Sequence, residues 1–421
     1  MLDYKKALKQ CIKCGACMSV CPVYQTTRLE TDVARGKLAV LREVESGRLD
    51  LSSGVSEILS RCLSCGACAE VCANSVQSNT LIQYGRQQDF LKHKPGMSQS
   101  LLKALTPEDL SHNVFIKESA LLEKLLCKKV PESSGLHLRF PLSFFTHRSI
   151  IPQISASPFL EGCLPDEKNA SGKIRVGFFV GCGTNYLFPE TGRALLDILK
   201  EVSIVPFIPE QQGCCGLMAY SLGDQKRAVD LAKRTIDLFS GQGLDYIITT
   251  CASCGAQLKA FPTLFETETE RRQAEKFSEK VMDVTSFLVD VVGYDKLGPT
   301  RQQISKGSPV RVVYHNPCHL RIKQKVVEAP MRFLSVIPGI ELVELSTQCC
   351  GHGGTFNFFN YSLSMQILDR RMSEIEQAQP DKIVTGCTGC LLQLQEGIQR
   401  IKTTKKIDVL HPLVLWKQQY L

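Results

Sequence analysis

The sequence predicts a multidomain α+β protein, with a small α-helical domain followed by two repeated α/β domains. Three observations support this fold class. The first hundred residues hold two cysteine runs of identical spacing, and the second half holds two matching sets of five cysteines. Around those sets, short apolar strand patterns alternate with amphipathic helical patterns, which is typical of α/β domains. At 421 residues, the chain is long enough for two or three domains with ordinary cores.

The composition indicates a metalloprotein of a reducing compartment. Hydrophobic residues make up 43% and charged residues 22%, as in globular proteins, but there are 20 cysteines. Secreted disulfide scaffolds are usually short and carry an export signal, whereas the segment Met1–Lys6 contains no apolar leader. No apolar stretch approaches the ~18 residues that span a bilayer. We therefore expect thiols that bind metal in a cytoplasmic protein without a transmembrane segment.

The net charge of +8 does not predict nucleic-acid binding. Thiolates that bind iron are deprotonated, and a four-iron cluster with four thiolates carries about −2. Two such clusters would lower the net charge to about +4. The basic residues are also dispersed along the chain. We therefore expect no nucleic-acid partner.

The two N-terminal cysteine runs predict two [4Fe-4S] cubane clusters. Each run has the spacing C-x2-C-x2-C-x3-C, and every cysteine of the second run lies 51 residues after its counterpart. In two-cluster ferredoxins with this spacing, the fourth cysteine of each run ligates the other cluster. Structural zinc is the alternative, but it does not explain four-cysteine runs that are used twice with crossed partners. The assignment is Cys11, Cys14, Cys17 and Cys72 for cubane 1, and Cys21, Cys62, Cys65 and Cys68 for cubane 2.

The second half of the chain is a duplication. Each copy carries one cysteine, then a Cys-Cys-Gly triplet, then a C-x2-C pair, and the intervals between these motifs are nearly the same in both copies. We predict one metal centre in each copy. A zinc site that uses four of the five thiols is the alternative. The first set is Cys182, Cys214, Cys215, Cys251 and Cys254, and the second set is Cys318, Cys349, Cys350, Cys387 and Cys390.

The cysteines of both sets follow predicted strands, so parallel strand ends would bring them together. The strands expected in the first copy are 174–180, 203–207 and 245–250, with helices over 189–202 and 223–239. The strands expected in the second copy are 310–314, 339–345 and 382–385. In the N-terminal domain, residues 34–41 are expected to be helical.

The predicted domain boundaries follow from these patterns. Residues 1–96 form the two-cluster domain, 97–172 a helical segment and an extended linker, 173–306 the first α/β domain and 307–421 the second. Within the linker, Phe115–Lys128 has helical spacing, and the proline-rich stretch from Pro141 to Gly172 suggests an extended chain.

These motifs resemble a known family over nearly the whole chain. Tandem ferredoxin runs followed by two cysteine-rich CCG domains resemble the iron–sulfur subunits of glycolate oxidase and D-lactate dehydrogenase. The same architecture occurs in the heterodisulfide reductase iron–sulfur subunit and in one subunit of anaerobic glycerol-3-phosphate dehydrogenase. The supporting stretches are Tyr314–Leu320, Ile337–Leu342 and Cys349–Phe356. The resemblance implies Rossmann-like CCG domains that hold one or two further, non-cubane [4Fe-4S] clusters.

The resemblance also implies a function. The chain contains no P-loop and no complete G-x-G-x-x-G motif, because Tyr186 stands at the last glycine position after Gly181. We therefore expect an electron-transfer subunit whose separate FAD-containing partner oxidises a 2-hydroxy acid, glycolate or D-lactate. The electrons would pass to a quinone or another acceptor protein, and the partner could hold the chain at the cytoplasmic membrane face.

Two alternatives from other classes stay open. The chain could be a catalytic subunit of the heterodisulfide reductase type that cleaves a disulfide at non-cubane clusters, or its second half could be a zinc-stabilised docking module. His315, His319 and His352 lie beside cluster cysteines in the sequence, where they would donate hydrogen bonds to sulfur, relay protons or serve only as polar neighbours.

Overall fold

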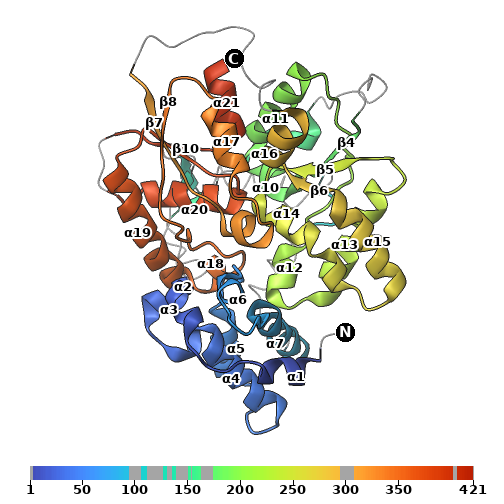
Figure 1. The fold of residues 1–421 in the computed structure, drawn as a ribbon. Coiled ribbons are helices and arrows are strands. Elements are labelled where there is room, and N and C mark those ends of the chain that lie inside the picture. The colour runs from blue at the N-terminus through green and yellow to red at the C-terminus, as the bar shows by residue number, and fades with distance from the viewer. Residues whose placement is uncertain are drawn as a thin grey trace.

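The computed structural model describes residues 3–93, 106–110, 127–129, 135–138, 150–152, 154–162, 174–293, 308–401 and 405–420. Figure 1 shows three parts. The N-terminal helices, in blue, lie beneath two lobes, one formed by the first copy of the duplication (green and yellow) and one by the second (orange and red). This mixture of helices and parallel sheets confirms the predicted combination of a helical domain with two repeated α/β units.

The N-terminal part is helical, as predicted. A core of Leu8, Leu38, Leu41, Leu59 and Leu81 holds its helices together. Because apolar residues recur at helical spacing, the longer helices α4, α5 and α7 each bury one face against their neighbours. The elements are α1 (Tyr4–Lys9), α2 (Ala16–Val20), α3 (Pro22–Thr27), η1 (Glu30–Asp32), α4 (Ala34–Glu45), α5 (Ser53–Ser60), α6 (Ala67–Glu70) and α7 (Ser78–Lys92).

The close approach of α4 to η1 predicts a large effect at Gly36. A Cβ atom at this position would lie 1.9 Å from the carbonyl oxygen of Glu30, so the backbone would have to move. We expect Gly36→Ala to lower the free energy of unfolding by about 3 kcal/mol, the upper range for overpacking. Gly54→Ala, in helix α5, is the matched control because its nearest neighbour is Ser52 Oγ at 3.9 Å. Thermal unfolding of both variants measures the difference, and equal stability would contradict the prediction.

The first copy builds a three-stranded parallel sheet of order β4-β5-β6. The strands β4 and β5 are shorter than expected, and the predicted strand 203–207 is wrong: only Phe207 pairs, in a single bridge to Gly177. The elements are β4 (Val176–Phe178), α10 (Gly181–Tyr186), α11 (Pro189–Glu201), α12 (Leu217–Leu222), α13 (Gln225–Phe239), β5 (Tyr246–Thr249), α14 (Ala252–Lys259), α15 (Glu268–Lys280) and β6 (Val281–Asp283).

The second copy builds a four-stranded parallel sheet of order β10-β9-β7-β8. Its strand β8 pairs with β7 where the first copy has only the Phe207 bridge, so all three predicted strands of this copy are confirmed. The elements are β7 (Val310–Tyr314), η7 (His319–Lys323), α17 (Ala329–Ser335), β8 (Ile340–Val343), α18 (Phe356–Phe359), α19 (Tyr361–Ala378), β9 (Lys382–Val384), α20 (Thr388–Ile398), β10 (Asp408–Leu410) and α21 (Pro412–Tyr420).

The two copies share one hydrophobic core. Phe178 and Ile198 of the first copy pack in the same cluster as Phe333 and Trp416 of the second. Helix α21, at the C-terminus, lies beside α11 of the first copy (Figure 1), and Lys417 forms an ion pair of 2.5 Å with Asp197 there. The duplicated units are therefore closely joined, and their facing surfaces are fixed relative to one another.

A buried histidine at this junction predicts acid sensitivity. The Nε2 atom of His411 lies 2.9 Å from the carbonyl oxygen of Thr250, and its Nδ1 accepts from the Leu413 N–H at 3.2 Å. Both bonds suit the neutral ring, and burial lowers the pKa of His411 to about 4. In the unfolded chain, His411 takes up a second ring proton below its ordinary pKa of about 6.5, whereas in the folded chain the ring stays neutral down to about pH 4. The free energy of unfolding is therefore highest above about pH 6.5 and falls between about pH 6.5 and 4.

We expect the wild-type chain to lose about 2 kcal/mol more unfolding free energy than His411→Gln between pH 7 and pH 5. Denaturant unfolding at the two pH values measures this difference directly. Other buried histidines titrate in both proteins and cancel in the comparison. An identical loss in the two proteins would contradict the prediction.

The segment between the two halves contains a sheet that the sequence pattern did not predict. Strands β1 (Cys127–Lys129), β2 (Gly135–Leu138) and β3 (Ile150–Pro152) form an antiparallel sheet of order β1-β2-β3. Most of the helix expected over Phe115–Lys128 lies outside the described residues, but its last two residues belong to β1. None of the helices in the described ranges is long and apolar enough to span a membrane.

Candidate functional site

The two cysteine runs line two adjoining hollows in the N-terminal part. All cysteines of the two runs and the two sets are free thiols. The fourth cysteine of each run lies with the first three of the other run, and Cys68 lines both hollows. The first hollow is lined by Cys11, Cys14, Cys17, Cys68 and Cys72, and the second by Cys21, Cys62, Cys65 and Cys68. Each hollow therefore brings together the first three cysteines of one run and the fourth cysteine of the other, the grouping that was expected from the sequence.

Buried charges surround the second hollow, and the cysteine motifs did not point to them. The side chain of Lys37 is 1% exposed, and its Nζ donates to the Thr31 carbonyl oxygen at 2.8 Å. Asp32 Oδ1 lies 3.8 Å from Lys37 Nζ and 2.7 Å from Arg61 Nε. Burial lowers the pKa of Lys37, while the nearby Cys62 thiol opposes this effect. The hollow thus places cations beside thiols that must be negative to bind metal.

The first set of five cysteines comes together at the ends of β4 and β5. Cys182 and Cys215 each share a hydrogen bond with Cys214, and Cys215 also shares one with Cys254. Hydrogen bonds from Cys214 and Cys254 lower the pKa of Cys215 to about 6. Gly216, which follows the vicinal pair, has a φ of +82° that disfavours other residues, so it lets α12 begin directly after the pair.

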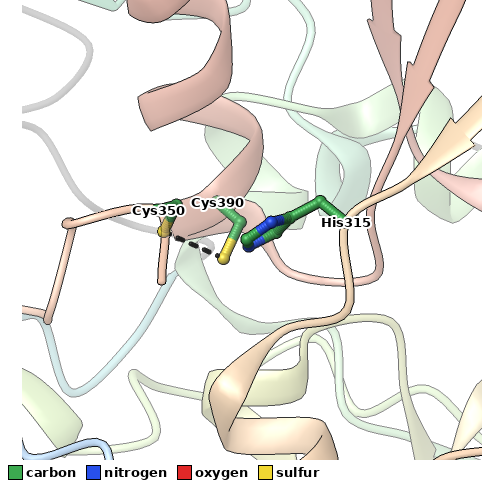
Figure 2. A group of neighbouring side chains, drawn as sticks. All are labelled: His315, Cys350 and Cys390. Carbon is green, nitrogen blue, oxygen red and sulfur yellow. Dashed lines mark hydrogen bonds between the residues drawn. The ribbon is translucent and has the colours of Figure 1, made fainter. Parts of the chain in front are cut away.

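The second set repeats this arrangement. Cys349 shares hydrogen bonds with Cys318 and Cys350, and these lower the pKa of Cys349 well below its ordinary value. The sulfur atoms of Cys350 and Cys390 lie 3.3 Å apart (Figure 2), and Cys390 also contacts Cys387. Each set therefore gathers all five predicted thiols, from three separate loops.

The two sets meet each other, which the sequence did not predict. Cys251 of the first set shares a hydrogen bond with Cys387 of the second. Each of these two cysteines also contacts a hydroxyl group of the other copy: Thr388 Oγ1 lies 3.1 Å from Cys251 Sγ, and Ser253 Oγ lies 3.1 Å from Cys387 Sγ. The ten thiols thus form one continuous line across the junction of the two copies.

The second set also faces the N-terminal cysteine runs. Cys65 and Cys349 pack against one small apolar cluster that contains Leu63 and Phe356. Burial, followed by the charge of Cys349, raises the pKa of Cys65 to about 12. Around this contact, Glu70 lies 3.5 Å from Arg321 and 3.4 Å from Lys325. In spatial order, the groups are the first hollow, the second hollow, the second set and the first set.

The three histidines named in the sequence occupy different positions. A ring nitrogen of His315 lies with the sulfur atoms of Cys350 and Cys390 within 4.8 Å of one another. His319 instead spans separate parts of the chain: its Nδ1 is 2.9 Å from Ser253 Oγ, and it forms a hydrogen bond with the Ser64 backbone. His352 lies over Gly389, where a Cβ atom would be 2.7 Å from the ring. Of the three, His315 faces the thiols most directly.

The donor chemistry of these groups fits iron–sulfur clusters. Thiolates are soft ligands that favour iron–sulfur clusters and zinc, and the thiols of the two sets have mainly one another as partners. The pKa is raised for three thiols of the first set and four of the second. Hydrogen bonds with neighbouring thiols leave the negative charge on those neighbours, and burial adds to the effect, as expected of thiols gathered around a common centre. The cationic setting of the second hollow points to the same chemistry.

Family models match three segments of this chain. A 4Fe-4S dicluster domain matches residues 7–76, and a cysteine-rich domain matches residues 176–259 and again residues 312–395. The matched segments contain both cysteine runs and both sets. They support iron–sulfur clusters as the cofactors of the protein.

Curated proteins match this chain, two of them over almost its full length. A probable glycolate oxidase iron-sulfur subunit of Bacillus subtilis is 29% identical over 420 residues, which cover 96% of this chain and 92% of that protein. Lactate utilization protein A of Geobacillus kaustophilus is 34% identical over 241 residues, 56% of this chain and 96% of that protein. One subunit of the fumarate reductase (CoM/CoB) of Methanothermobacter marburgensis is 29% identical over 414 residues, 94% of this chain and 70% of that protein.

These similarities agree with the geometry of the cysteine groups. The two hollows lie within the dicluster match, and the ten-thiol line lies within the two cysteine-rich matches. The chain belongs to the family of iron–sulfur subunits that combine a 4Fe-4S dicluster domain with cysteine-rich CCG domains, as in glycolate oxidase and lactate utilization proteins.

Proposed function

We propose that this chain is the iron–sulfur electron-transfer subunit of an FAD-linked 2-hydroxy acid oxidoreductase that acts on glycolate or D-lactate. The FAD lies on a separate partner subunit, and a quinone or another carrier accepts the electrons. The names of the relatives support this activity. The observation that carries it is the unbroken spatial order of the four cysteine groups, because electron transfer needs centres that are close together.

The cysteines hold four clusters in this proposal. The crossed groups of the two hollows ligate two [4Fe-4S] cubanes, and the two sets ligate further, non-cubane [4Fe-4S] clusters. When bound, such clusters accept and release single electrons at potentials that hydrogen bonds and burial adjust. The protein supplies the thiolates, shields the thiols of the two sets from water, and offsets negative charge with Lys37 and Arg61.

One end of the series is accessible and the other is enclosed. Cys14, at the outer edge of the first hollow, is exposed, and its neighbour Ile12 is 67% exposed. Cys251 and Cys254, in the first set, are buried. A redox partner of the first run would therefore meet an open apolar edge, whereas the sets depend on relay from within the chain or on small molecules.

The first experiment measures iron and acid-labile sulfide on anaerobically purified chain. Four clusters predict about sixteen irons per chain, against about eight if only the two runs bind. With its flavoprotein partner, glycolate or D-lactate should bleach the visible absorbance of the clusters, and the chain alone should not respond. Zinc in the sets, or oxidation of substrate by the chain alone, would refute the proposal.

A second candidate is disulfide reduction, and the contact between Cys251 and Cys387 favours it. Two adjoining centres could each take one sulfur of a disulfide, which is cleaved to two thiols by two electrons and two protons. The similarity to a fumarate reductase (CoM/CoB) subunit agrees with this chemistry. A chain of this kind, reduced artificially, should be reoxidised by a disulfide without any partner, whereas an electron-transfer subunit should not.

The organisation that we propose keeps the predicted boundaries. Residues 1–96 form the two-cluster domain, 97–172 the connecting segment, and 173–306 and 307–421 the two CCG domains, each Rossmann-like. We propose that the protein works in the cytoplasm, at the membrane face where its partner binds.

A further inference from the structure

The two CCG copies differ at one position that faces the thiols. Phe179 and His315 are equivalent, because each precedes the first cysteine of its set by the same interval. Their backbone N–H groups also donate to the equivalent carbonyl oxygens of Ile248 and Val384. Phe179 packs among the buried residues around the first set. At the same place in the second set, His315 puts an imidazole ring against the sulfur atoms.

A buried arginine holds this imidazole in one orientation. Arg371 Nε donates to His315 Nδ1 at 3.1 Å, and both residues are 1% exposed. Glu374 fixes the arginine in turn, with Oε2 2.7 Å from Arg371 Nη1. The first copy has Thr235 at the equivalent position, on the matching buried face of α13, and therefore has no such cation there.

The arginine determines which ring nitrogen carries the hydrogen. A guanidinium is always protonated, so Nδ1 must act as an acceptor in its bond with Arg371. The hydrogen of the neutral ring therefore lies on Nε2, and an Nε2–H group is a donor rather than a metal ligand. Figure 2 shows the ring beside Cys390, with a nitrogen directed at its sulfur atom and Cys350 next to it.

We propose that His315, positioned by Arg371, donates a hydrogen bond to the cysteine sulfur atoms of the second set and gives that set a higher reduction potential than the first. This inference rests on the proposed function, in which both sets bind clusters. Hydrogen bonds to ligand sulfur stabilise the extra negative charge of the reduced state. The apolar Phe179 supplies no such bond to the first set, so the electron taken up by the pair of sets resides mainly on the second.

The test is the reduction potential of each centre in the complete, cluster-loaded chain, followed by EPR during redox titration. His315→Phe gives the second set the residue that the first set has at this position. We expect it to lower the reduction potential of the second set by at least about 59 mV, which is a tenfold change in the equilibrium constant of a one-electron reduction. The potentials of the other centres should not change. His315→Gln retains an N–H donor and should restore part of the shift. His411→Gln is the control, a buried histidine that contacts backbone atoms instead of thiols.

A measurement on the wild-type chain keeps the inference falsifiable if a variant fails to fold. With ¹⁵N-labelled histidine, pulsed EPR should show one weak nitrogen coupling at the second set, as expected across a hydrogen bond. A strong coupling would show that His315 is a ligand, and the absence of any coupling would show that it makes no hydrogen bond to the thiolates; either result would overturn the inference. An unchanged reduction potential in a His315→Phe variant with full iron content would overturn it as well. About eight irons and no signal from either set would refute the proposed function as well.

Discussion

Cys21→Ala should remove the cluster of the second cysteine run and leave that of the first, although Cys21 itself belongs to the first run. Its thiol lines the hollow of Cys62, Cys65 and Cys68. Three thiolates do not complete a cubane site, so we expect the loss of about four irons per chain. Cys72→Ala is the matched variant, because Cys72 lines the other hollow.

The surviving cluster identifies the pairing. Cys14 is exposed at the first hollow, whereas Cys65 of the second hollow is partly buried and packs against the same apolar cluster as Cys349. An iron chelator should therefore strip the remaining N-terminal cluster rapidly from Cys21→Ala and slowly from Cys72→Ala. The reverse pattern would show that each run ligates its own cluster and would contradict the crossed assignment.

Arg86→Met should cause a large loss of stability. Arg86 is 8% exposed and lies on α7, between the second run and the first CCG copy. Its guanidinium donates to the carbonyl oxygens of Leu59, Ser60, Cys62 and Ser221 and to Ser64 Oγ. Methionine fills similar space but leaves buried carbonyl groups without a hydrogen-bond donor. Each such group that water does not reach lowers the free energy of unfolding by about 1–3 kcal/mol.

We expect Arg86→Met to lower the unfolding free energy by about 4 kcal/mol and to speed iron release, because the Cys62 loop loses its anchor. Calorimetry and the rate of iron release measure both effects. Arg48→Met is the control, since Arg48 is 68% exposed and its ion pair with Glu43 contributes under about 1 kcal/mol. Equal effects of the two substitutions would show that the buried hydrogen bonds of Arg86 stabilise the protein no more than the exposed ion pair of Arg48, and would contradict the prediction.

Both predictions concern contacts around the second cysteine run, where the N-terminal part meets the CCG copies. The second set, rather than the first, faces the N-terminal runs, since Cys65 and Cys349 share an apolar cluster. If electrons enter at the runs, the second set is the first of the two to receive them. The higher potential proposed for this set would then hold an electron at the junction until the first set or a substrate takes it.

The sequence predicted the local parts of this protein well. The C-x2-C spacing and the constant register of the duplication identified the thiols that lie together, because ligand loops and strand–loop units are short-range features. Buried strands such as Val310–Tyr314 were confirmed for the same reason. The predicted strand 203–207 failed because pairing depends on a partner edge, and in the first copy only Phe207 reaches one. The antiparallel sheet that contains Cys127–Lys129 gave no clear alternation and was missed.

The sequence by itself predicted which residues would carry the chemistry: two cysteine runs and two sets of five thiols, recognisable by their spacing. Only the tertiary structure decided how these groups meet. The contact of Cys251 with Cys387, the position of Lys37 in the second hollow and the Arg371–His315 pair all join residues that are far apart in sequence or unremarkable in pattern. Such contacts depend on how whole surfaces pack, and local spacing carries no information about that packing.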